Sequence, residues 1–174
     1  MKRTEMALVI GLLFVMQSPV FGQSIKQKSI GGPEDLVSSL YSLISFEAGK
    51  TPDWTRVRPL FHDHASIYLR TSQEDMTLYN PDGFVARFQA DIYALELAPS
   101  GFTETIRGLT CDTYSEIAQC RVVYEAKRLS GKMPPQRGVD FFQLVQQDGL
   151  WLIFSIVNDV EMFSGRIPEA WVNR

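Results

Sequence analysis

The only two histidines of the chain flank an aspartate, in the run His62, Asp63 and His64. Imidazole nitrogens and carboxylate oxygens bind zinc, but a zinc site needs three or four such ligands. A histidine beside a carboxylate can also transfer protons, which makes His64 a candidate catalytic residue. A polar loop between a helix and a strand has the same composition. We interpret the run as such a loop and predict no bound metal ion.

A second set of candidates belongs to a hairpin predicted over residues 138–161. Two apolar runs meet there at Asp148-Gly149, a dipeptide that tolerates the positive φ angles of a two-residue turn. Because side chains alternate between the faces of a strand, seven candidate site residues share one face with Leu144. They are Asp140, Phe142, Trp151, Ile153, Ser155, Val157 and Asp159. Burial on an apolar wall raises the pKa of a carboxyl group and suits a general base, so Asp140 is a candidate. Alternatively, Asp140 and Asp159 lie solvated at the open end of the hairpin.

The opposite face of this hairpin is apolar as well. It carries Val139, Phe141, Val145, Leu150, Leu152, Phe154 and Ile156. A sheet with one solvated face does not show this pattern, so both sides of the hairpin must be covered. The chain has too few predicted helices to cover both, and an exposed apolar patch normally marks an interface. We predict a homodimer through Val139, Phe141, Phe154 and Ile156.

Helix and strand signals predict the sequence of elements in the rest of the chain. The sequence predicts helices over 33–48, 53–61 and 81–98, strands over 65–71, 77–79, 102–111 and 117–129, and then the hairpin. Helices segregated beside an antiparallel sheet indicate an α+β fold. Phe88 lies on the apolar face of the third helix. Tyr68 shares a strand face with Arg70, where its hydroxyl could donate to a ligand or form an ordinary cross-strand surface pair.

Bulk composition excludes several classes of protein. The chain has 174 residues, enough for one domain, and a net charge of −3. It lacks the clustered Lys and Arg that nucleic-acid binding requires. No apolar run reaches the roughly 18 residues of a membrane span. Since no GxSxG, P-loop or dinucleotide fingerprint occurs, we predict neither a serine-triad hydrolase nor a nucleotide enzyme, and no cofactor.

The N-terminus has the pattern of a signal peptide. Lys2 and Arg3 precede a short apolar run over 6–16, and small residues end at Gly22, where we place the cleavage site. An uncleaved anchor is the alternative. The predicted divisions are a signal peptide over 1–22, a flexible leader over 23–32, a single domain over 33–163 and a C-terminal tail over 164–174. An exported protein, periplasmic or secreted, can form disulfides.

Three stretches resemble the nuclear transport factor 2-like superfamily, in its SnoaL-like (polyketide-cyclase-like) branch. They are LYSLISFEAGKTPDWTRVRPLFHDHA (40–65), IAQCRVVYEA (117–126) and GVDFFQLVQQDGLWLIFSI (138–156). The resemblance implies a cone, in which a curved antiparallel sheet of about six strands wraps around three N-terminal helices and encloses a pocket. Dimers through the sheet are frequent in this family. The family includes isomerases, dehydratases, cyclases, epoxide hydrolases and proteins that only bind partners, so the fold does not identify an activity.

In such a cone we expect Tyr68, Phe88 and the face of the hairpin that carries Asp140 to line the pocket.

Three functions remain open. The first is an exported protein that binds a small apolar or carbonyl-bearing molecule without assigned catalysis. The second is a cofactor-free isomerase, dehydratase or cyclase that acts on a hydrophobic carbonyl compound, with Asp140, His64 and Tyr68 as candidate catalytic residues. The third is a protein-interaction module that uses the sheet face. A desolvated acid opposite a Tyr or His would favour the enzyme, and a filled interior would favour the interaction module.

The resemblance also places a two-residue turn at Ser115-Glu116. Counting from that turn, Cys111 faces Cys120 as a non-hydrogen-bonded pair, in which opposite Cα atoms come to roughly 4.5 Å. This separation lies near the short end of the disulfide range. We predict a disulfide between these cysteines. The alternative is two reduced cysteines packed as small apolar residues.

Overall fold

The computed structural model describes residues 31–130 and 134–172. The predicted signal peptide and most of the predicted leader lie outside the described residues. The first helix, α1 (Pro33–Ile44), has Pro33 at its start and acids in its first turn, both of which suit a helix N-terminus. It ends at Ile44, several residues before the predicted end.

A six-stranded curved sheet forms most of the domain. Its strands are β1 (Phe61–Arg70), β2 (Met76–Tyr79), β3 (Phe102–Tyr114), β4 (Ile117–Arg128), β5 (Gln136–Gln147) and β6 (Leu150–Val160). Their order across the sheet is β2-β1-β6-β5-β4-β3. Neighbouring strands are antiparallel except β1 and β6, which run parallel. The predicted α+β fold with about six strands is therefore confirmed, and one parallel pair is added to it.

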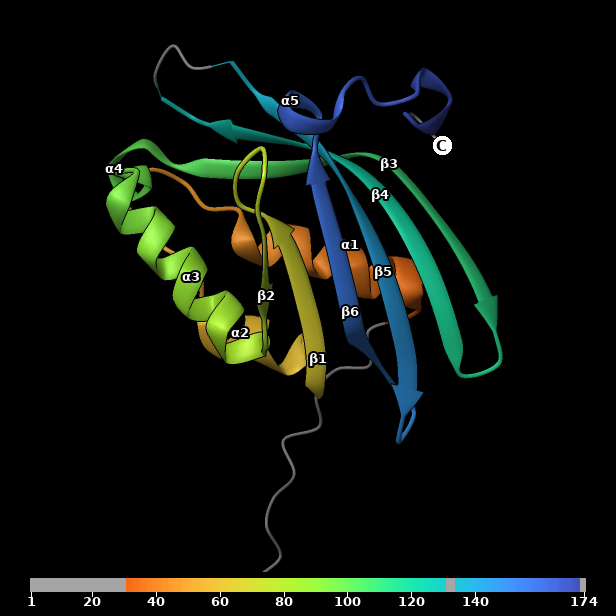
Figure 1. Ribbon diagram of the computed structural model, residues 1–174. Helices are drawn as coiled ribbons and strands as arrows, with labels where there is room; N and C mark the ends of the chain where they lie inside the picture. Colours follow the sequence, from red (N-terminus) through yellow and green to blue (C-terminus); the bar gives the residue numbers. More distant parts are fainter. Residues whose placement is uncertain (1–30, 131–133, 173–174) are drawn as a thin grey trace, which may run out of the picture.

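Helix α1 and the helix after β2 lie on the concave side of the sheet (Figure 1). Helix α1 packs against β3, β4 and β6, whereas α3 (Pro81–Ala94) packs against β1 and β2. Asn80 caps α3 by accepting a hydrogen bond from the backbone N–H of Gly83 at 2.7 Å, as its position before Pro81 predicts. The core between these layers contains fully buried side chains, among them Leu36, Val37, Val57, Ile67, Val122, Phe142, Leu144 and Ile153.

The second predicted helix is shorter than its pattern suggested. Helix α2 (Trp54–Val57) gives way to a 3-10 turn, η1 (Arg58–Leu60), and Phe61 already begins β1. Pro59 lies within this turn and cannot donate the backbone hydrogen bond that a continuing α-helix needs. As a result His62, Asp63 and His64 belong to strand β1. The predicted loop at this run is wrong.

The final hairpin has its predicted turn but not its full predicted register. Asp148 and Gly149 both have positive φ angles, of 53° and 76°. Near the turn Leu144 faces Ile153 as predicted, but beyond it Gln143 faces Ser155. Phe154 is therefore an extra residue on β6, a β-bulge, which reverses the inward and outward faces of the strand after it.

Four predicted positions on β6 change face because of this bulge. Ile156 points inward and is 4% exposed, so it cannot belong to the predicted dimer surface. Val157 is instead 46% exposed on the outer face, and the same reversal takes Ser155 and Asp159 off the inner wall. The inward positions are taken by Ile156, Asn158 and Val160, all of which are buried.

The C-terminal segment covers part of the outer face of the sheet. It contains α5 (Glu161–Ser164) and the 3-10 turn η2 (Glu169–Trp171). The guanidinium of Arg121 lies 4.4 Å from the centre of the Trp171 ring, and the ring of Phe141 packs edge-on against it at 6.2 Å. At Gly108 the Trp171 carbonyl oxygen comes so close that a Cβ would overlap it. The tail thus occupies part of the surface that we predicted for a dimer.

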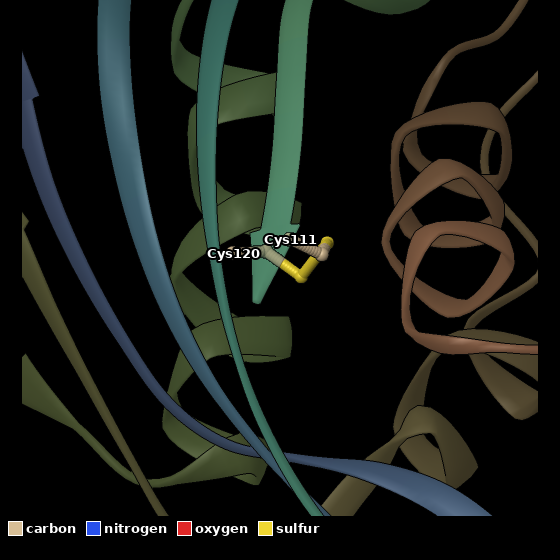
Figure 2. The surroundings of a disulfide bond; sticks show 2 residues. All are labelled: Cys111 and Cys120. Carbon is tan, nitrogen blue, oxygen red and sulfur yellow. A yellow bond between two sulfur atoms is a disulfide. The ribbon is translucent and has the colours of Figure 1, made fainter. Parts of the chain in front are cut away.

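Strands β3 and β4 pair in the predicted register, with Cys111 opposite Cys120. A disulfide joins the two residues, whose Cα atoms are 4.1 Å apart. Figure 2 shows the bridge on the side of the sheet that faces the helices. Cys120 is fully buried there, so the bridge belongs to the core.

Among the described residues, no helix is long and apolar enough to cross a membrane.

Candidate functional site

A cavity of about 210 Å³ lies between the helices and the concave side of the sheet. Its apolar lining includes Leu40, Ile44, Leu69, Phe84, Phe88 and Ile156. Its polar lining includes Tyr41, Arg70, Thr71, Tyr79, Arg87, Asp91, Glu104, Tyr124, Asp140 and Asn158. Such a mixture, apolar walls with a few convergent polar groups, is typical of a small-molecule site.

Asp140 is the centre of the polar network in this cavity. The hydroxyl of Tyr41, from α1, donates to Oδ2 of Asp140. The side-chain amide of Asn158, from β6, donates to Oδ1 at 2.7 Å. The same amide donates to the Tyr124 hydroxyl oxygen at 3.0 Å. Because Asp140 and Asn158 are each only 8% exposed, these hydrogen bonds hold the carboxylate in one orientation.

Two of the acids that line the cavity, Asp140 and Glu104, have raised pKa values, and the causes differ. Burial raises the pKa of Asp140 to about 6, although the hydrogen bonds from Tyr41 and Asn158 lower it. Burial, followed by the negative charge of Asp140, raises the pKa of Glu104 to about 8. At pH 7 Asp140 is therefore mainly ionised and Glu104 mainly protonated. One cavity holds a proton acceptor and a proton donor.

Glu104 is positioned through its backbone. Its N–H donates to the Ser45 hydroxyl oxygen at 2.9 Å, just after α1 ends. Within the described part of the chain its carboxyl group makes no hydrogen bond, and it retains partial accessibility because it faces the cavity. This leaves the protonated carboxyl free to donate to a molecule bound in the cavity.

Tyr124 faces the same space. Its hydroxyl oxygen accepts from Asn158, so its own proton is available to another acceptor. Burial, followed by the charges of Asp140 and Glu104, raises the pKa of Tyr124 well above its ordinary value, so the hydroxyl stays neutral. The ring lies against Gly138, where a Cβ would overlap the hydroxyl oxygen. Gly138 therefore makes room for Tyr124 beside the network.

Ion pairs lie at one end of the cavity. Nε of Arg70 lies 3.2 Å from Asp159, and Nε of Arg87 lies 2.8 Å from Asp91. These pairs are partly exposed, so we infer that this end is the mouth. Each arginine has an acidic partner, so the mouth carries little net charge.

The predicted site residues are not all brought together. Asp140 and Phe88 line the cavity. Phe142, Ile153 and Trp151 are buried in the core rather than exposed to the cavity. Three further residues lie apart from it. Tyr68 and Val157 are neighbours on the outer face, 40% and 46% exposed, and His64 is exposed on β1. Ser155 and Asp159 follow the β6 bulge and do not line the cavity.

Sequence reasoning missed Tyr41, Glu104, Tyr124 and Asn158. Tyr41 and Tyr124 have the pattern of ordinary apolar-face residues, and without the β6 bulge Asn158 would lie on the outer face. A bulge between Ile106 and Gly108 affects which face of β3 Glu104 lies on, and it was not predicted from the sequence. Gly108 was the available signal, since an isolated glycine within a strand pattern suggests a bulge.

No family model matches this sequence, and no curated protein is similar enough to count as a relative. Solved structures share the fold. An NTF2-like protein with a cystatin-like fold from Novosphingobium aromaticivorans has a TM-score of 0.59 at 13% identity, over 79% of this chain and 82% of that one. A protein from the same bacterium, provisionally named scytalone dehydratase, has a TM-score of 0.55 at 15% identity, over 73% and 80%. The yeast Ubp3-associated protein Bre5 has a TM-score of 0.53 at 8% identity, over 71% and 89%. At these identities the likeness shows the fold alone.

Proposed function

Because the chain has the fold of the nuclear transport factor 2-like proteins, we propose that its cavity binds a small, largely apolar carbonyl compound and catalyses a cofactor-free proton transfer on it. The observation that carries this proposal is Asp140, a buried carboxylate fixed by Tyr41 and Asn158 in the same cavity as the half-buried Glu104. Of the three catalytic candidates from the sequence, Asp140 lines the cavity, whereas His64 and Tyr68 do not.

In the proposed reaction Asp140 is the general base. It removes a proton from the carbon next to the carbonyl group of the substrate, and the electron pair moves onto the carbonyl oxygen to form an enolate. The Tyr124 hydroxyl and the protonated Glu104 carboxyl are the available hydrogen-bond donors for that oxygen. Asp140 then returns its proton to a different carbon, which completes an isomerisation. Alternatively, a hydroxyl group on the neighbouring carbon leaves with a proton from Glu104 as water, which completes a dehydration.

Deuterium exchange tests this chemistry without knowledge of the natural substrate. Cyclic enones and β-hydroxy ketones small enough for the cavity would be incubated with the protein in D₂O and followed by proton NMR. We expect exchange next to the carbonyl group with the wild-type protein and a loss of about 100-fold or more in Asp140→Asn, which has no basic oxygen. Asp112→Asn is the matched control, because that acid is exposed on β3 and does not line the cavity. Equal exchange by Asp140→Asn and the wild type would refute Asp140 as the base.

Binding without catalysis is the second candidate, and one observation favours it. Both oxygens of Asp140 already accept hydrogen bonds from the protein's own Tyr41 and Asn158, as they would in a purely structural network. Native mass spectrometry of protein purified from its own host would look for a retained small molecule. A retained ligand together with no exchange on any carbonyl compound would support this candidate over the enzyme.

Export and assembly belong to the proposal as well. The N-terminal pattern supports export to the periplasm or outside the cell, which N-terminal sequencing of the mature protein would test. The C-terminal segment does not cover Tyr68, Phe154 and Val157, which stay exposed on the outer face. This apolar surface supports a homodimer. It also supports a third function, in which another protein docks there. Sedimentation equilibrium at micromolar concentration distinguishes a dimer from a monomer.

A further inference from the structure

The two histidines lie together on the outside of the molecule, away from the cavity. His62 and His64 both belong to β1, and their ring centres are 5.5 Å apart. The pairing of β1 with β6 jumps from Phe61 opposite Ile153 to Ser66 opposite Ser155. The pairing is therefore irregular between these two points, and the two-residue spacing of His62 and His64 along one strand places both rings on one face.

The separation of the rings suits one metal ion held by both. Two imidazoles bound to the same ion, each through a nitrogen about 2.1 Å from it, have ring centres roughly 5 to 5.5 Å apart at common coordination angles. The edge-on contact of His62 with Phe154, at 5.5 Å between ring centres, limits the motion of one ring. Little rearrangement is needed to bring both nitrogens onto one ion.

The charges around the histidines do not oppose a cation. Arg58 donates to Asp63 at 3.0 Å and to Asp82 at 2.7 Å, so this cluster carries one net negative charge. Asp148 lines the same concavity as His62 and His64. Asp63 is engaged by Arg58 and is therefore not a free ligand.

From this geometry we propose that His62 and His64 chelate one divalent transition-metal ion on the surface, with water at its other positions. The described ranges contain no group of three or more His, Cys, Asp or Glu side chains suited to a metal. A site of two imidazoles and water favours Cu²⁺ over Ni²⁺ and Zn²⁺, following the general order of affinity. His62 Nδ1 accepts from the His64 N–H at 3.1 Å, and this exposed bond is given up if that nitrogen takes the metal. Such a bond is weak beside a metal–imidazole bond. This site is independent of the function proposed for the cavity.

Copper binding by the full chain, produced without a histidine tag, tests the proposal. Isothermal titration with Cu²⁺ should give one ion per chain, and electron paramagnetic resonance should show coupling to two imidazole nitrogens. His62→Ala and His64→Ala should each weaken binding by at least about tenfold, the loss typical even for indirect partners of a ligand. Asp63→Asn is the control and should bind within about threefold of the wild type, because the Asp63 side chain bonds to Arg58 rather than to either histidine ring.

The double variant His62→Ala, His64→Ala tests whether Cu²⁺ binds at the two histidines or at another place on the chain. Its circular dichroism should match that of the wild type, because the replaced side chains lie at the surface. If it binds Cu²⁺ as tightly as the wild type, or if the wild type binds none, the proposal is wrong. It is also wrong if only one of the two single variants loses affinity.

Discussion

Replacing Glu104 by Gln should remove a pH-dependent loss of stability. In the folded protein burial and the charge of Asp140 raise the pKa of Glu104 from its ordinary value of 4.5 to about 8. An acid whose pKa is raised on folding contributes stability that is fully present below its unfolded pKa. That contribution is lost as the pH rises through the folded pKa. Gln has the shape of the protonated acid and does not ionise, so the variant should not show this loss.

The size of the effect follows from the interval between the two pKa values. Each pH unit between them corresponds to about 1.4 kcal/mol. From about pH 5 to about pH 8 the wild type would therefore lose up to roughly 4 kcal/mol through Glu104. Because the carboxyl faces a cavity that can hold water, which screens its charge, we expect about 2 kcal/mol to be measured.

Urea unfolding between about pH 5 and pH 9 measures this difference. The stability of Glu104→Gln relative to the wild type should rise with pH across this range and level off above about pH 8. Glu74→Gln is the control, because Glu74 is exposed, and its difference from the wild type should stay flat. A constant difference for Glu104→Gln, within about 0.5 kcal/mol, would show that the carboxyl is not desolvated and would remove the acid from the proposed mechanism.

Three further changes test the packing around the site. Gly138→Ala should displace the Tyr124 ring and cost about 1–3 kcal/mol by overpacking; urea unfolding measures the loss, and an unchanged stability would contradict the close contact. Trp151→Ala should cost roughly 3–5 kcal/mol through cavity formation, and a loss below about 1 kcal/mol would mean that Trp151 is not buried. Intact-mass analysis after denaturation and alkylation without reductant should show no alkyl group on Cys111 or Cys120, whereas two added groups would disprove the disulfide. Prior reduction should add both groups and cost about 2–3 kcal/mol.

Local chemistry made much of the fold predictable. Asp148-Gly149 fixes one hairpin turn because this dipeptide accepts the required positive φ angles. Asn80 and Pro81 fix the start of α3 through a cap and a preset backbone angle. The pairing of Cys111 with Cys120 is different, because it followed from a turn at Ser115-Glu116 that the family resemblance implied.

The candidate site was much less predictable, because it depends on bulges and on contacts between distant residues. Phe154 gives no sign in the sequence that it is an extra residue, yet it determines that Asn158 rather than Val157 lies opposite Asp140. Tyr41 reaches Asp140 across 99 positions of sequence. A helical pattern places Tyr41 on the buried face of α1, but it does not identify which strand residue the hydroxyl will meet.

The position of β6 in the sheet has a consequence for folding. Strand β6 is the last strand in the sequence, but it lies between β1 and β5. The pairing of Ser66 with Ser155 closes a long loop, and such distant pairings form slowly. Until residues 150–160 are available, β1 has no strand on its inner side, and both β1 and β5 expose an edge that can pair with other chains. A chain cut before Leu150 should therefore aggregate rather than fold as a smaller domain.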